Sequence, residues 1–397
     1  MSLAMKIFIA LILGIVVGLL LQNNITFANT YIKPFGTIFI NLIKFIVCPV
    51  VLFSIIAGMI SLCDLSRVGS IGAKTVGYFI VTTFFAIIIG LVGGFLFKGS
   101  FPILAVADIE YKAKPIGSFM DTIVNIFPSN FLAPLTNANM LQIIVMAILI
   151  GLAIILVDER RTPAVNIINS FNEIFMKCMD LIIRLSPIGV FSLICPVVAA
   201  NGAAILGSLA MVLLAAYACY TVHILVVYGI AIKFFSDLKP MEFFKGHLPA
   251  MIFAFSSASS VGTLPINMTG CRKMGATQEV TSFVLPLGAT INMDGTAIYQ
   301  GVSAIFIAAC YGIDLTVGQM VTIALTATLS SIGTAGVPGA GVIMLAMVLS
   351  SVGLPVDGIA LVAGVDRIFD MGRTTVNITG DAVASLIISH SEKKKAS

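Results

Sequence analysis

The chain has 397 residues, of which 59% are hydrophobic and 10% are charged, and its formal net charge is +4. Soluble domains carry about 25% charged residues, so this composition excludes an ordinary soluble protein. The basic residues are scattered and form no stripe of the kind that binds nucleic acid. Composition therefore predicts an all-α polytopic membrane protein, because helices satisfy their own backbone polar groups in lipid.

The seven cysteines lie singly in apolar stretches, without CxxC or metal-binding spacing. This pattern indicates free thiols and no disulfide framework. The histidines are also isolated in the sequence, and we interpret His223, His247 and His390 as structural or surface residues.

Six apolar segments in the first part of the chain are predicted to cross the bilayer, which takes about 20 residues in a helix. They cover residues 5–21, 35–62, 76–97, 140–157, 166–199 and 205–232. Pro187 should kink the fifth segment. Residues 98–139 are weakly apolar, contain several prolines and carry both charge signs, so we expect an external loop there.

Lysines and arginines gather in alternate connections between these segments. They stand at positions 67 and 74, 160 and 161, 233 to 245, 272 and 273, and 393 to 395. Basic connections of membrane proteins face the cytoplasm. The pattern predicts a multi-pass protein of the cell (inner) membrane with both termini cytoplasmic.

The apolar stretch 247–268 is interrupted between residues 256 and 265 by serines, Gly262 and Pro265. It begins and ends beside basic residues, on one side of the membrane. This predicts a re-entrant hairpin, whose tip must be buried in protein or line a wet cavity. The alternative is an ordinary helix with serines that pack against its neighbours.

A seventh span, 279–310, is broken at 288–296, where Asp294 stands in the middle of an apolar run. A carboxylate at that depth is costly unless a cation satisfies it, and the glycines let the backbone unwind and free carbonyl oxygens. Such oxygens suit an alkali cation better than a transition metal. A second interrupted stretch, 316–350, has a glycine-rich tip on the outer side, so the two hairpins indicate an inverted repeat.

The last apolar helix, 362–389, carries an unusual set of polar residues. They are Asp366, Arg367, Asp370, Arg373, Thr374, Asn377 and Asp381. The last five lie within about 100° of one helix face. Both charge signs together with Thr and Asn indicate one wall of a solute and ion site, and the alternative is an internal salt bridge between helices.

Four motifs occur in a fixed order along the chain. They are the serine-rich tip ending Gly262-Thr263-Leu264-Pro265, the Asn292-Met293-Asp294-Gly295-Thr296 break, the glycine-rich second tip, and Asp370-x-x-Arg373-Thr374-x-x-Asn377-x-x-x-Asp381. Together they resemble the dicarboxylate/amino acid:cation symporter family, which includes the prokaryotic glutamate/aspartate transporters. The resemblance extends over nearly the whole chain.

The resemblance implies eight transmembrane helices and two re-entrant helical hairpins, at about 240–273 and 316–350, in a homotrimer. Residues 1–69 and 127–200 would form a scaffold and trimerisation domain. Residues 70–126 and 201–397 would form a transport domain that slides through the bilayer as an elevator.

The resemblance also implies the ligand sets. The acidic amino-acid substrate would meet Ala258, Ser259, Ser260, Thr296, Val337, Pro338, Gly341, Asp370, Arg373, Thr374 and Asn377. One co-transported sodium ion would use Gly288, Asn292, Asn377 and Asp381, and a second would use Thr290, Met293, Ser331, Ile332 and Thr334. A third would use Thr82, Thr83, Asn292 and Asp294.

The residue chemistry agrees with an acidic α-amino acid. Arg373 is a permanent forked cation that suits a carboxylate, and Asp370 offers an anion to an ammonium group. Backbone N–H groups at the hairpin tips suit a second carboxylate. A plain dicarboxylate would be repelled by Asp370, and a neutral amino acid would leave Arg373 unpaired.

The sequence departs from its relatives at one place. Archaeal members have an arginine where Ala258 stands, and animal members have one where Met371 stands; this chain has Arg367 instead. On a helix Arg367 can reach Asp370, or it can pair near Asp366 and only hold the helix.

Other functions remain open at this point. An intramembrane enzyme would need a nucleophile and a base, and no histidine is placed to serve the serines of the first hairpin. A passive channel would have similar polar linings. Among carriers, the main alternative is a proton-coupled glutamate or dicarboxylate carrier.

Overall fold

The computed structural model describes residues 3–64, 70–103, 124, 127–137, 139–157, 162–202, 204–331, 340–363 and 365–396. Within these ranges every regular element is a helix, which agrees with the predicted all-α class. The short elements are η1 (Gln22–Asn24), α2 (Ile25–Phe27), η2 (Ala28–Ile32), η4 (Lys98–Ser100), α6 (Ala133–Thr136) and η7 (Val356–Gly358). The cysteines at 48, 178, 195, 219, 271 and 310 are free thiols, as predicted.

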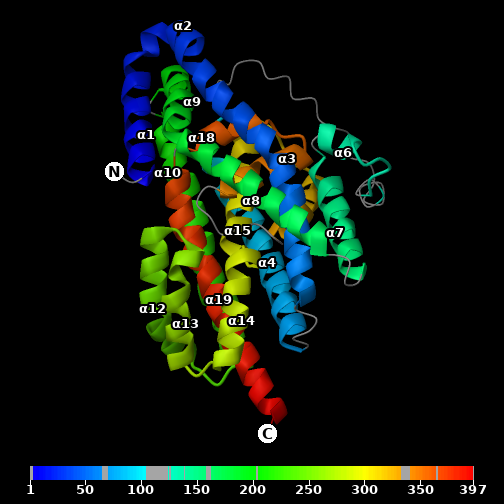
Figure 1. Cartoon of the computed structure of the whole chain (residues 1–397). Coiled ribbons are helices and arrows are strands. Elements are labelled where there is room, and N and C mark those ends of the chain that lie inside the picture. Colours follow the sequence, from blue (N-terminus) through cyan, green and yellow to red (C-terminus); the bar gives the residue numbers. More distant parts are fainter. Residues whose placement is uncertain are drawn as a thin grey trace.

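Five longer helices pack together in one part of the molecule (Figure 1). They are α1 (Leu3–Leu20), α3 (Lys33–Asp64), α7 (Met140–Leu156), α8 (Thr162–Arg184) and α9 (Ser186–Asn201). The helix α1 lies against α9, and α3 contacts α7, α8 and α9. Close approach of α1 and α9 depends on Gly18, where an added Cβ would stand 2.7 Å from the Cys195 carbonyl oxygen.

The remaining helices form a second group, centred on α15 and α19. In chain order they are α4 (Ser70–Phe97), α10 (Ala204–Val222), η6 (His223–Tyr228), α11 (Gly229–Phe235), α12 (Pro240–Ser257), α13 (Ser260–Lys273), α14 (Gln278–Ile291), α15 (Asp294–Cys310), α16 (Val317–Ser331), α17 (Ala340–Ser351), α18 (Ile359–Ala363) and α19 (Asp366–Ala396). All 17 residues of α15 are buried, so this helix forms the centre of the core. It crosses α4 at Gly90, where an added Cβ would lie 2.6 Å from the Ile298 carbonyl oxygen.

Two pairs of consecutive helices turn back on themselves. The helices α12 and α13 lie side by side in Figure 1 and are joined through Ala258, whose φ of 50° is left-handed, and Ser259. The helices α16 and α17 are also in contact. Their connection, residues 332–339, lies outside the described residues. Helix pairs thus occur at both places where the sequence predicts hairpins, and their depth in a membrane stays a prediction.

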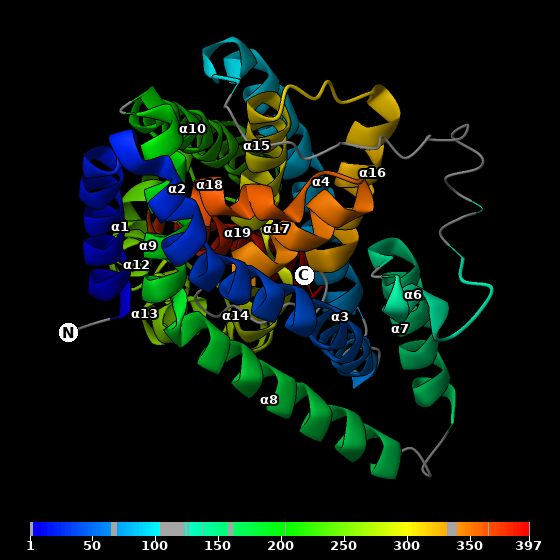
Figure 2. The same cartoon turned by 90° about the horizontal axis from the view of Figure 1, so that it is seen from above.

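Several element boundaries differ from the predicted ones. The fifth predicted span is two helices, α8 and α9, which separate at Leu185, and α8 runs obliquely along one edge of the molecule (Figure 2). Pro187 explains the separation, because proline fits the first turn of a new helix and breaks the interior of an existing one. The last helix begins at Asp366 and not at 362, because α18 precedes it as a separate short helix.

The first hairpin tip is shorter than predicted. Only Ala258 and Ser259 are non-helical, and Pro265 lies inside α13. The sixth predicted span is interrupted by the π-helical turn η6, which the apolar pattern does not reveal.

Three helical stretches among the described residues are long and apolar enough to cross a membrane: Gln22–Ile60, Ile71–Ser100 and Gly207–Phe235. Shorter apolar helices, including Gln142–Leu156 and Ser186–Ala200, accompany them. These helices agree with a multi-pass membrane protein. The predicted eight crossings, the two domains and the orientation of the termini stay predictions.

Candidate functional site

The polar site consists of the break between α14 and α15 and the polar residues of α19 that contact it. The break lies at its centre. Asn292 has an extended ψ of 104°, and helical backbone resumes at Asp294. The Asn292 side chain donates to the Asn377 carbonyl oxygen and to Asp381 Oδ1, both at 2.9 Å. The Gly295 N–H donates to Asn377 Oδ1 at 2.8 Å. The unwound segment is therefore bound to the polar face of α19, as expected for residues that act together.

Asp381 lies deep in this region, with 1% of its surface exposed. Its Oδ2 atom and Oδ1 of Asn292 have no hydrogen-bond donor among the described residues. Gly288 is pressed against it, because an added Cβ would stand 2.2 Å from Asp381 Oδ1. A buried carboxylate oxygen without a donor is costly, and an alkali cation is a suitable partner for it. These residues form a candidate cation site with oxygen ligands only.

Asp294, the first residue of α15, is completely buried and has three partners. Thr83 Oγ1 donates to Oδ1 at 2.6 Å, the Tyr228 hydroxyl donates to Oδ2 at 2.7 Å, and His223 Nε2 lies 3.2 Å from Oδ2. Thr82 instead donates to the Phe79 carbonyl of its own helix at 3.2 Å. Of the two threonines predicted to serve this carboxylate, the structure brings only Thr83 to it.

His223, interpreted from the sequence as a structural or surface residue, is a buried residue that contacts one of the site carboxylates. Its ring is fully buried and stacks edge-on against Tyr228, with 4.7 Å between ring centroids, and both side chains face Asp294. The π-helical turn η6 carries both residues. Such turns are rare and often occur at functional sites, but no sequence pattern marks this one.

Arg373 is buried in the N-terminal part of α19, with 1% of its surface exposed. Its Nη1 lies 3.1 Å from Asp366 Oδ1, and its Nη2 lies 3.0 Å from Asp370 Oδ1. The guanidinium also lies over the Tyr299 ring, 4.4 Å from the centroid, as a cation–π contact. Neither Nη atom makes a well-aligned hydrogen bond to a described residue, so the fork can still receive a carboxylate.

Two glycines bring backbone close to this arginine. An added Cβ at Gly341 would stand 1.7 Å from Arg373 Nη1, and one at Gly295 would stand 2.4 Å from the Arg373 carbonyl oxygen. The start of α17 and the start of α15 therefore both touch the N-terminal part of α19, at Arg373. Gly341 was a predicted substrate residue, and the structure places it against the arginine.

The first hairpin tip meets α19 on another side. Arg367 Nη2 donates to the Ser257 carbonyl oxygen at 3.0 Å, and Asn267 Nδ2 donates to the Ile378 carbonyl oxygen at 3.1 Å. Ser259 caps α13 by accepting from the Gly262 N–H at 3.1 Å. Four other predicted substrate residues are buried: Ala258, Ser260, Thr296 and Thr374.

The predicted sodium site under the second hairpin is described only in part. Met293 Sδ accepts from Thr296 Oγ1 at 3.7 Å and from Asn377 Nδ2 at 3.5 Å. Thr290 is exposed and donates to the Leu287 carbonyl of its own helix at 2.8 Å. The side chain of Ser331 and all of Ile332, Thr334, Val337 and Pro338 lie outside the described residues.

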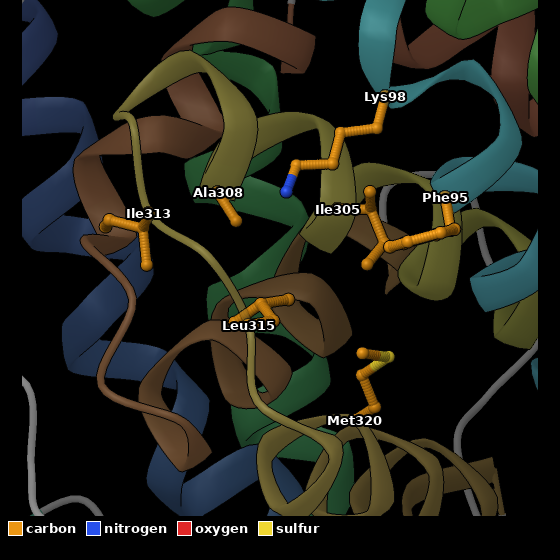
Figure 3. A pocket seen from close by; sticks show the side chains of 7 residues that line it. All are labelled: Phe95, Lys98, Ile305, Ala308, Ile313, Leu315 and Met320. Carbon is orange, nitrogen blue, oxygen red and sulfur yellow. The ribbon is translucent and has the colours of Figure 1, made fainter.

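A separate pocket lies near the end of α4 (Figure 3). Its lining is Phe95, Lys98, Ile305, Ala308, Ile313, Leu315 and Met320. Lys98 is paired with Asp314. The lining contains no predicted site residue, so this pocket is distinct from the polar site on α19.

Comparison with known proteins places these features in context. A family model described as "Sodium:dicarboxylate symporter family" matches residues 3–391. A "Proton/sodium-glutamate symport protein" of Geobacillus stearothermophilus is 37% identical over 98% of this chain and 94% of the relative. A "Proton/glutamate-aspartate symporter" of Escherichia coli is 37% identical over 99% and 93%. A "C4-dicarboxylate transport protein" of Bacillus subtilis is 31% identical over 99% and 94%.

Proposed function

Because the chain belongs to the sodium:dicarboxylate symporter family, which is a family of transporters and not of enzymes, we propose that it imports L-aspartate or L-glutamate together with sodium ions. The polar site on α19 would bind the amino acid. The buried carboxylates behind it would bind the coupling cations. The relatives' names include both glutamate and C4-dicarboxylate carriers, so the choice of substrate depends on the site itself.

The observation that carries the proposal is the pairing of Arg373 with Asp370 in a buried site. Their atoms Nη2 and Oδ1 lie 3.0 Å apart, and the guanidinium keeps unused hydrogen-bonding capacity. In the proposed complex, Arg373 binds the side-chain carboxylate and Asp370 binds the ammonium group. Backbone N–H groups at the hairpin tips bind the remaining carboxylate. A neutral amino acid would bring no side-chain carboxylate to the guanidinium, which would keep only its contacts with Asp366 and Asp370.

Among the proposed sodium sites, the one at Asp381 has the strongest support. Gly288, Asn292, Asn377 and Asp381 meet there, and one carboxylate oxygen lacks a donor. The site at Thr82, Thr83, Asn292 and Asp294 has weaker support. Three protein groups already surround the Asp294 carboxylate, and a cation would have to displace at least the His223 contact or share the oxygen.

We further propose that the protein works as a homotrimeric elevator. Residues 1–69 and 127–200 would form the fixed scaffold, and 70–126 and 201–397 the moving transport domain. The separate packing of α1, α3, α7, α8 and α9 supports this division. Site-directed cross-links between α3 and α17, which touch in this structure, should form in one transport state and be lost in the other.

Uptake into proteoliposomes tests the function. The purified protein should accumulate labelled aspartate or glutamate when sodium is high outside, without a pH gradient. Accumulation driven by a proton gradient and indifferent to sodium would favour the alternative, a proton-coupled carrier. Equilibration without accumulation under either gradient would indicate a passive channel and overturn the proposal.

A further inference from the structure

Arg367 joins the first hairpin (α12 and α13) to α19, the helix proposed to bind substrate. It stands in the first turn of α19, and its Nη2 donates to the Ser257 carbonyl oxygen at 3.0 Å. Its Nη1 lies 3.8 Å from Asp370 Oδ2. The sequence allowed pairing with either Asp370 or the neighbourhood of Asp366. The structure places Arg367 beside Asp370, while Asp366 contacts Arg373.

The Ser257 carbonyl that Arg367 contacts lies at the C-terminal end of α12. Ser257 is the last residue of α12, and the next residue, Ala258, has a left-handed φ of 50°. The final carbonyls of a helix carry partial negative charge and lack partners within the helix. The Arg367 guanidinium on α19 therefore caps α12 and holds the hairpin tip against α19.

The Asp370 carboxylate lies between two arginines. Oδ1 contacts Arg373 Nη2 at 3.0 Å, and Oδ2 faces Arg367 Nη1 at 3.8 Å. With Asp366, these residues form a group of two formal positive and two formal negative charges. Removing Arg367 would leave this partly buried group with a net negative charge beside Asp370.

We propose that Arg367 is a positioning residue that sets how strongly the site distinguishes an acidic amino acid from the same diacid without its amino group. This inference rests on the proposed function. The ammonium group of an amino acid competes with Arg367 for Asp370, so Arg367 weakens amino-acid binding. A diacid brings no cation and depends on Arg367 to offset the repulsion from Asp370.

The two ligands respond in opposite directions only if Arg367 acts through charge. A role limited to holding the hairpin would change both affinities by the same factor, because both ligands need the same tip. The ratio of the two dissociation constants is therefore the informative quantity.

Calorimetry on the full-length purified protein at fixed sodium and pH measures this ratio with aspartate and succinate. In R367M, aspartate should bind as tightly as in wild type or more tightly, and succinate should bind more weakly. We expect the succinate-to-aspartate ratio of Kd values to rise by about tenfold or more. R367K keeps the charge and should change the ratio by less than about threefold.

Two further variants complete the test. R367Q removes the charge but can still donate to the Ser257 carbonyl, so it should raise the ratio as R367M does, and it replaces R367M if that variant is not recovered. R272M is the matched control, because Arg272 also links two segments, through Thr281 and Ser282 at 3.1 Å, away from the site. It should leave the ratio unchanged.

Two results overturn the proposal in different ways. Wild-type protein that binds aspartate, with an unchanged or lower ratio in R367M and R367Q, would overturn the role of Arg367 alone. Wild-type protein that binds neither ligand would overturn the proposed function, and this inference with it.

Discussion

Arg373 contacts Asp366 two helical turns before it on α19, with 3.1 Å between Nη1 and Oδ1. Asp370 lies between them in sequence and contacts Nη2 at 3.0 Å. Each terminal nitrogen of the arginine proposed to bind substrate thus contacts one aspartate, and the guanidinium lies over the ring of Tyr299. This arrangement orients the guanidinium before substrate arrives, which reduces the ordering cost of binding.

The first prediction concerns Arg373 itself. Arg373→Cys should weaken aspartate or glutamate binding by about 30-fold to several thousand-fold, because losing a buried charged partner costs about 2–5 kcal/mol. Calorimetry measures the affinity, and uptake of Ser, Ala or Cys by the variant should be measured beside it. Arg272→Met serves as the control and should bind normally. An R373C protein with wild-type affinity for acidic amino acids would refute the assignment.

The second prediction concerns Asp381. If this carboxylate binds a coupling cation, sodium and substrate must strengthen each other's binding reciprocally. Asp381→Asn keeps the volume and removes the charge. The negative slope of log Kd for substrate against log sodium concentration should therefore become shallower by about one. Ser385→Ala changes a buried polar group one turn further along α19 and should keep the wild-type slope. An unchanged slope in D381N would exclude a sodium site at this carboxylate.

The third prediction concerns Gly288. An alanine Cβ there would stand 2.2 Å from Asp381 Oδ1, so Gly288→Ala must displace the carboxylate or the helix. Overpacking of this kind costs about 1–3 kcal/mol. Thermal unfolding in detergent should show a lower Tm and a smaller gain in Tm on adding sodium. Gly207→Ala is the control, since an added Cβ there meets nothing within 4 Å. Equal Tm values for the two variants would contradict the predicted clash between an alanine side chain at position 288 and Asp381.

The fourth prediction separates two adjacent threonines. Thr83 donates to Asp294 Oδ1 at 2.6 Å, whereas Thr82 donates to the Phe79 carbonyl in its own helix. Thr83→Ala should cost about 1–3 kcal/mol, because a buried carboxylate loses a donor, and it should reduce transport. Thr82→Ala should have a smaller effect on both Tm and uptake. If the two variants lose stability and sodium response equally, both hydroxyls serve the same site, and the distinction between Thr83 and Thr82 is wrong.

The sequence predicted the class and the family because both depend on patterns along the chain. Apolar runs of about 20 residues predict membrane helices, and polar interruptions in those runs are too costly to be accidental. The interruption around Asp294 was therefore visible, and the structure breaks the helix there, at Asn292 and Met293. The polar face of α19 followed from helical periodicity alone.

Contacts between distant segments could not be predicted in this way. His223 and Asp294 are separated by 71 positions, and they meet because a π-helical turn rotates His223 toward α15. Tyr299 was also missed, because nothing in an apolar helix marks which aromatic ring will lie beneath a guanidinium.

The sequence by itself indicated a polytopic helical membrane protein with ionisable groups in its apolar segments, because burial in lipid imposes that composition and period. Its four motifs indicated the transporter family. The tertiary structure alone decided which partner each of those groups has. Arg367 could reach either of two aspartates along the helix, and only the packing of α12 against α19 directs it to the Ser257 carbonyl and Asp370. Helical spacing limits which residues can meet, whereas the neighbouring helices determine which of them do.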